Sequence, residues 1–202
     1  MESAVLSRRS LLQAIAATIA SAAVPIGWPE VAQAMDHAHA APAAPDASTF
    51  SLLSPAEAAD IDAVAAQIVP SDDSPGAREA GAVSFIDRAL ATFFSQLAGD
   101  YRADLAAFQA ACRTKHPQAA SFAALGSAQQ IAFLHGVDQT RFFNTTRLLT
   151  LLGMFALPEY GGNHDGVGWK LIGFEDAHVF HPPFGHYDRE YPGFEVTSGK
   201  AQ

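Results

Sequence analysis

The sequence contains very little cysteine and few basic residues, and both shortages restrict what the protein does. Cys112 is the only cysteine in 202 residues. The chain therefore cannot close an internal disulfide, and one thiol cannot hold an iron–sulfur cluster. Twelve Lys and Arg stand against 21 Asp and Glu, which gives a net charge of −9. Because a nucleic-acid-binding protein needs a basic face that displaces counterions from phosphate, this charge argues against that class.

Several cofactor and catalytic motifs are also missing. Gly166-Val167-Gly168 is followed by Leu171 where the third glycine of a dinucleotide-binding loop would stand, and no predicted strand precedes it. The chain has no P-loop, no G-x-S-x-G nucleophile elbow and no C-x-x-C-H haem-attachment motif. The sequence therefore predicts no catalytic residue and no cofactor bound by this chain.

The N-terminus has the features of an export signal. Arg8 and Arg9 lie in S-R-R-S-L-L, which resembles the twin-arginine motif, and an apolar run extends from Leu11 to about Ile26. Ala32-Gln33-Ala34 is an A-x-A cleavage pattern. The alternative is an uncleaved membrane anchor, but the run is shorter than the roughly 20 residues that span a bilayer. We expect residues 1–34 to be a twin-arginine signal peptide that directs the protein to the periplasm.

This export route carries proteins that are already folded, often with a cofactor inserted or a partner attached. The chain should therefore bind a cofactor or travel with a protein that does. Residues 35–52 are rich in Ala and Pro and predict a flexible linker, with His37 and His39 in solvent.

Residues 53–175 predict an all-α domain, a small bundle of about five helices that ends near Phe155. Ser54, Pro55 and Glu57 form a capping box with proline at the first helical position. Ser127 and Gln130 indicate a second capping box. Residues 140–155 are strongly apolar and predict the most buried helix. Two further helices follow from apolar stripes, which consist of Val83, Ile86, Leu90, Phe93 and Leu97, and of Tyr101, Leu105, Phe108 and Cys112.

An acidic pair and the lone cysteine each have two interpretations. Asp72 and Asp73 precede a helix, where aspartates usually cap the N-terminus, although a paired-carboxylate acid/base site is the other interpretation. Cys112 lies on an apolar stripe, which favours a buried thiol. A lone cysteine in an exported protein also forms disulfides with another chain, so an intersubunit bridge stays open.

Residues 176–202 predict an extended arm. This segment is rich in Pro and Gly and carries five aromatic residues that need cover: Phe180, Phe184, Tyr187, Tyr191 and Phe194. Four histidines also fall within 23 residues around it: His164, His178, His181 and His186. Imidazole suits zinc or iron, but such ligand sets usually lie on rigid elements, and these residues lie in predicted coil.

The run "EYGGNHDGVGWKLIGF", residues 159–174, is the most unusual part of the chain, and its glycines suit a phosphate cradle, a metal loop or a docking surface. Together with "IVPSDDSPGAREAGAVSFID", residues 68–87, it resembles the gluconate 2-dehydrogenase subunit 3 family. The similarity covers residues 54–174 and includes the pattern P-x-Y-G-G-N…G-W-K-x-I-G-F. This family comprises the small subunits of membrane-associated flavin dehydrogenases that act on gluconate, glucose, fructose and related polyols.

The resemblance implies a non-catalytic accessory subunit. Its catalytic partner would be a flavoprotein of the GMC oxidoreductase type that carries FAD, and a multihaem cytochrome c with haem c would take the electrons. The small subunit would supply the export signal and act as a chaperone for flavoprotein maturation. The complex would lie at the periplasmic face of the inner membrane, and this chain would meet the membrane only through the complex.

This interpretation predicts that the glycines of residues 159–174 determine shape and that aromatic side chains bind the partner. We expect Tyr160 and Trp169 to be interface anchors, as large aromatic side chains often are. Because a small bundle cannot cover the five aromatic residues of the arm, we expect the arm to wrap the flavoprotein, with Phe180, Phe184 and Tyr187 as its anchors. Two other hypotheses remain: a free-standing periplasmic metalloenzyme that uses the histidine cluster, and a binding module for a small sugar acid.

Overall fold

A computed structural model describes residues 50–177 of the chain. The signal peptide, most of the linker and the arm with Phe180, Phe184 and Tyr187 lie outside this range. Within it the chain forms α-helices and no strand, so the predicted all-α class is confirmed. The six helices are α3 (Pro55–Ile68), α4 (Ala82–Ala91), α5 (Ser95–Lys115), α6 (Ser127–Leu134), α7 (Arg141–Phe155) and α8 (Val167–Ile172), with two 3₁₀ turns at η1 (Pro158–Tyr160) and η2 (His164–Gly166).

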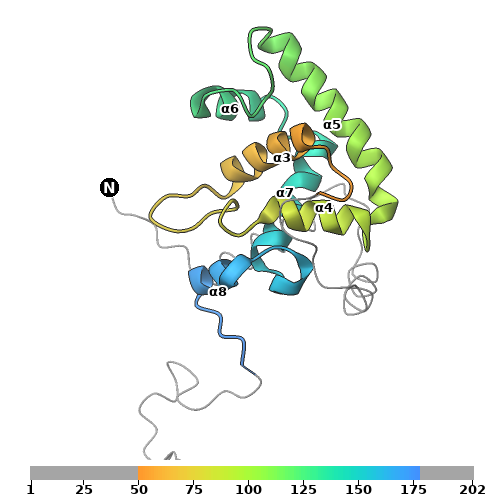
Figure 1. The fold of residues 1–202 in the computed structure, drawn as a ribbon. Coiled ribbons are helices and arrows are strands. Elements are labelled where there is room, and N and C mark those ends of the chain that lie inside the picture. The colour runs from red at the N-terminus through yellow and green to blue at the C-terminus, as the bar shows by residue number, and fades with distance from the viewer. Residues whose placement is uncertain (1–49, 178–202) are drawn as a thin grey trace, which may run out of the picture.

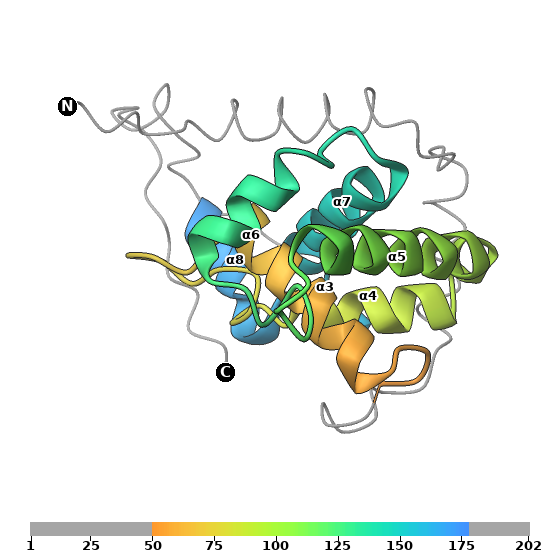
Figure 2. The ribbon, with the colours of Figure 1, turned by 90° about the horizontal axis from the view of Figure 1, so that it is seen from above.

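Helix α7 is the centre of the bundle, as its apolar sequence predicts. It packs against α3, α4, α5 and α8, and α4 in turn contacts α5 (Figure 2). Leu149, Thr146 and Thr150 of α7 are fully buried. The Thr146 hydroxyl lies 2.9 Å from the hydroxyl of Tyr101 on α5, which gives both buried groups a partner. Helices α6 and α8 lie toward opposite ends of the bundle (Figure 1).

A cluster of phenylalanines fills the space between α5, α6 and α7. The ring of Phe108 lies 4.6 Å from that of Phe142 and 5.3 Å from that of Phe133, measured between centroids. Phe122, from the connection between α5 and α6, lies 5.1 Å from Phe108. The predicted stripe on α5 is confirmed, because Tyr101, Leu105, Phe108 and Cys112 are all buried. In the described residues no helix is long and apolar enough to cross a membrane.

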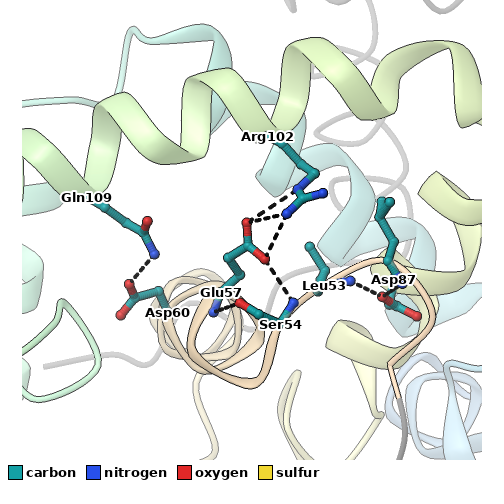
Figure 3. A network of polar contacts seen from close by, with 8 residues as sticks. Leu53, Ser54, Glu57, Asp60, Asp87, Arg102 and Gln109 are labelled. Atoms are coloured by element: carbon teal, nitrogen blue, oxygen red, sulfur yellow. Dashed lines mark hydrogen bonds and ion pairs between the residues drawn. The ribbon is translucent and has the colours of Figure 1, made fainter.

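The start of α3 follows the predicted capping box (Figure 3). Ser54 accepts a hydrogen bond from the amide of Glu57, and the Glu57 carboxylate accepts one from the amide of Ser54. Arg102 of α5 binds the same carboxylate at 3.2 Å. Partial burial alone would raise the pKa of Glu57, but the bonds from Ser54 and Arg102 lower it below its usual value.

Three local predictions were wrong. The stripe expected to continue from α4 through Phe93 and Leu97 is interrupted, because Thr92 has φ −125° and ψ −98° and α5 begins at Ser95. Ser127 does not cap α6; the Gln129 side chain instead accepts a bond from the amide of Gly126.

Asp72 and Asp73 do not cap the next helix either. Helix α4 has Gly81 at its N-cap, with no side-chain cap. Asp72 forms its own turn instead, since its carboxylate accepts bonds from the amide and the hydroxyl of Ser74. The bonds from Ser74 lower the pKa of Asp72.

Two buried carboxylates connect segments that are distant in sequence (Figure 3). Asp87 of α4 is 4% exposed and accepts hydrogen bonds from three consecutive amides, those of Ser51, Leu52 and Leu53, at 2.7 to 2.9 Å. Residues 50–52, which we expected at the end of the linker, are thereby held against the domain. Asp60 of α3 is 2% exposed and accepts bonds from Gln109 and from the amide of Ala123. These bonds compensate for the removal of the two carboxylates from water.

The three amides bound to Asp87 generate a stability prediction. Replacing Asp87 with Asn puts an N–H group against a backbone N–H and removes the charge. We expect Asp87→Asn to lower the free energy of unfolding by about 2 kcal/mol, measured by urea denaturation. Asp62→Asn is the control, because the Arg78–Asp62 pair is 55% and 30% exposed and such pairs contribute about 0.5 kcal/mol. Equal losses in the two variants would contradict the anchoring role of Asp87.

Candidate functional site

The glycine-rich run of residues 159–174 folds back onto the C-terminal end of α7. It forms η1, η2 and α8, and the backbones of α7 and α8 touch where glycines stand. A Cβ atom at Gly168 would clash with the carbonyl oxygen of Met154, and one at Gly162 would clash with that of Gly153. Both neighbours are backbone atoms that cannot rotate away. The glycines therefore determine shape by permitting close approach of two chain segments.

Asn163 fastens this contact. It is fully buried, and its backbone has φ 45°, a conformation that asparagine tolerates better than most residues. Its side-chain amide donates to the carbonyl of Ala156 at 2.9 Å, and its side-chain oxygen accepts from the amide of Gly168 at 2.9 Å. Its own amide donates to the carbonyl of Gly153 at 2.7 Å. One residue thus joins the end of α7 to the start of α8.

Trp169 provides a second fastening and also part of the surface. Its indole N–H donates to the carbonyl of Phe155 at 2.9 Å, so one orphan carbonyl at the end of α7 gains a partner. The indole ring lies 5.3 Å from the ring of Phe174. Trp169 is half-buried, whereas Phe174 is 49% exposed and Leu171 is 45% exposed.

Trp169 and Phe174 border a groove of about 310 Å³, which we call the C-terminal groove. Its walls are mostly apolar, and Asp176 is the one carboxylate among them. The lining residues are Phe155, Ala156, Leu157, Tyr160, Trp169, Ile172, Phe174 and Asp176. An apolar groove with an exposed aromatic rim is suited to binding a protein segment, and it offers few groups for acid–base chemistry.

Tyr160 and Trp169, the two predicted anchors of the domain, have different surroundings. Tyr160 is only 6% exposed, and its ring lies 6.2 Å from that of Phe93 in the core. Burial raises the pKa of Tyr160, and the neighbouring Glu159 raises it further. Trp169 leaves more of its surface at the groove. The predicted interface role of both residues stays a prediction, and Phe174 and Leu171 are exposed residues that the sequence analysis did not select.

Cys112 lies on the inner side of α5, 2% exposed and not in a disulfide within the described residues. Burial raises the pKa of its thiol, and the nearby Asp60 carboxylate raises it further. A protonated, buried thiol reacts slowly with disulfides. This position agrees with the buried-thiol interpretation, and a bridge to another chain stays a prediction.

Of the four clustered histidines, only His164 lies in the described part of the chain. Its amide donates to the carbonyl of Ala80, and its ring occupies the space beside Gly81, which has φ 68°. Residues 50–177 contain no group of three or more His, Cys, Asp or Glu arranged to hold a metal. His178, His181 and His186 lie outside this range.

Sequence reasoning missed α8, because a six-residue helix in a glycine-rich run gives no apolar periodicity. One signal was present: Gly173 follows Ile172 and has φ 65°, the left-handed conformation that glycine adopts after the last helical residue.

The contact between α7 and α8 can be tested with a pair of glycine variants, one at the contact and one away from it. Gly168→Ala should lower the free energy of unfolding by about 2 kcal/mol or more because a methyl group must enter a packed backbone contact. In a chain that begins at Met35, Trp169 is the only tryptophan, so its fluorescence should shift to the red if α8 detaches.

Gly99→Ala is the control, since a Cβ at Gly99 meets nothing within 4 Å. In the interior of α5 this change should raise stability, by up to about 1 kcal/mol, with unchanged fluorescence. Unchanged fluorescence and stability in Gly168→Ala would show that α8 does not need this contact.

Comparison with known proteins agrees with the motif-based resemblance. The model of the family described as gluconate 2-dehydrogenase subunit 3 matches residues 55–176, which include every helix from α3 to α8. No curated protein and no solved structure matches the chain. Because the family match extends over more than half of the sequence and includes both the bundle and the C-terminal groove, the chain belongs to the gluconate 2-dehydrogenase subunit 3 family.

Proposed function

We propose that this chain is the non-catalytic small subunit of a periplasmic FAD-dependent sugar or polyol dehydrogenase of the gluconate, glucose or fructose type. The single observation that carries the proposal is the C-terminal groove. Its rim is formed by the motif residues Trp169 and Phe174, and its surface is apolar instead of reactive. A subunit that docks onto a catalytic partner needs such a surface, whereas an enzyme needs polar groups that converge on a substrate.

The proposed partner is a GMC-type flavoprotein that carries FAD, and a multihaem cytochrome c would accept its electrons. Arg8 and Arg9 support an export role, because a single twin-arginine leader is sufficient for a complex that crosses the membrane folded. In this proposal the small subunit helps the flavoprotein mature, and the complex then lies at the periplasmic face of the inner membrane.

The binding energy would come from two neighbouring segments. Phe174 ends the described family motif, and the described chain stops three residues later at Ala177. Asp176, the first residue of the predicted arm, lines the C-terminal groove. Phe180, Phe184 and Tyr187 would extend the same apolar surface along the flavoprotein, with Pro182 and Pro183 limiting the conformational entropy lost on docking.

The export role is tested by replacing Arg8 and Arg9 with Lys. The catalytic subunit should then stay in the cytoplasm, and periplasmic dehydrogenase activity should fall at least about tenfold, measured by dye reduction in separated fractions. Arg113→Lys, on the exposed side of α5, is the control and should leave both fractions unchanged. Normal periplasmic activity in the double variant would rule out the escort role.

The docking role is tested at Phe174. Phe174→Ala removes an exposed groove aromatic and should weaken binding to the flavoprotein by about 2 kcal/mol, or about 30-fold in Kd. Leu171→Ala is a matched control, because Leu171 on α8 is similarly exposed but does not line the groove, whereas Phe174 just after α8 does. Pull-down at falling concentration measures both variants. Loss of binding in Leu171→Ala alone would place the interface on the outer face of α8.

A further inference from the structure

The stretch of chain that leads into the arm also forms one edge of the C-terminal groove. Just after α8, the amide of Phe174 donates to the carbonyl of Trp169 at 2.8 Å. The amide of Ala177 then donates to the carbonyl of Glu175 at 3.0 Å, which closes a three-residue turn centred on Asp176. Both Phe174 and Asp176 line the groove. The arm is therefore continuous with the groove wall.

The groove suits an apolar side chain better than a polar ligand. Three consecutive residues of its wall already accept hydrogen bonds from inside the domain through their carbonyl oxygens, namely Phe155, Ala156 and Leu157. A sugar or a peptide backbone placed here would find few acceptors, whereas a hydrocarbon side chain needs none. The rings of Trp169 and Phe174, 5.3 Å apart between centroids, form an edge against which a further aromatic ring packs.

The size of the groove and the spacing of the sequence single out Phe180. A cavity of about 150 Å³ holds a benzene molecule, so the groove volume of about 310 Å³ has room for a phenyl ring. Phe180 is the first aromatic residue after Ala177, the last described residue. Three residues span up to about 10 Å, which lets its ring turn back beside Asp176. The next aromatic residue, Phe184, follows two prolines, which restrict the backbone from turning back.

An uncovered groove of this kind is a liability in a subunit that has not met its partner. Phe174 is 49% exposed at its edge, and apolar surface left open to water favours aggregation. A covering side chain on the same polypeptide has a high effective concentration, because only a short connection separates it from the groove. The arm is thus better placed than any separate molecule to cover this surface.

We propose that the ring of Phe180 fills the C-terminal groove of the isolated subunit. This contact concerns the chain alone and does not depend on the identity of its partner or on the export role. It adds a step to the proposed docking, and only that step rests on the proposed function. The flavoprotein inserts an apolar side chain in place of Phe180, and the released arm then binds the flavoprotein surface.

The test is the rate at which a maleimide labels a cysteine placed in the groove wall. Ile172 lines the groove and is half-buried, so Ile172→Cys in the full-length chain puts the thiol under the proposed ring. Cys112 is 2% exposed, and the unchanged chain measures its background. Adding Phe180→Ala should raise the labelling rate of Ile172→Cys at least about fivefold, because the thiol no longer waits for the ring to leave.

Two controls separate this contact from a general effect on the arm or on α8. Phe194→Ala removes the last aromatic residue of the arm and should leave the labelling rate of Ile172→Cys unchanged. Leu171→Cys reports on α8 itself, because Leu171 is 45% exposed and does not line the groove. Its labelling rate should be the same with Phe180 and with Phe180→Ala.

The proposal is overturned if Phe180→Ala leaves the labelling rate of Ile172→Cys unchanged. It is also overturned if Phe180→Ala accelerates Leu171→Cys equally, because α8 would then have loosened as a whole. Loss of the protection on dilution would overturn it too, since the arm of a second copy would then cover the groove. No flavoprotein is present in these measurements, so a failure of the docking role leaves their outcome unaffected.

Discussion

The C-terminal groove depends on the close contact between the backbones of α7 and α8. Gly168 brings α8 against the carbonyl of Met154, and Asn163 bonds to both helices in this position. If a side chain separated the two helices, the bond from Trp169 to the carbonyl of Phe155 would be lost, and Phe174 would leave the groove rim. The glycines of the family motif therefore serve packing, and the surface that they position is made by the aromatic residues between and after them.

The bundle supports this contact by holding α7 in place. Asp87 and Asp60 are buried and bind backbone amides of segments that lie 34 to 63 residues away in sequence. Each carboxylate fixes a loop that would otherwise have no regular hydrogen-bonding partner. Helix α7, whose C-terminal end lines the C-terminal groove, also packs against α3, α4 and α5.

Much of the fold followed from the sequence because helical periodicity and capping are local. Ser54, Pro55 and Glu57 gave the start of α3 correctly, and Tyr101 to Cys112 gave the inner side of α5. The break after Ala91 was missed because Phe93 still continues the apolar spacing of α4, so only the backbone angles of Thr92 reveal it. The site was harder. Asn163 is a polar residue in a turn-rich run, and only the three-dimensional contact shows that it is a buried link between two helices.

The polar and apolar groups of residues 153–174 are arranged in a way that suits docking better than catalysis. Their distinctive polar groups are used inside the chain: Asn163 binds Ala156 and Gly168, and the indole N–H of Trp169 binds Phe155. A catalytic loop would leave such groups pointing at a substrate, with pKa values matched to proton transfer. The apolar side chains that this run leaves at the surface are instead those of Leu171 and Phe174, with part of Trp169. A motif that uses its polar atoms for its own shape and exposes its apolar atoms is suited to holding another protein, which is the role that a small subunit requires.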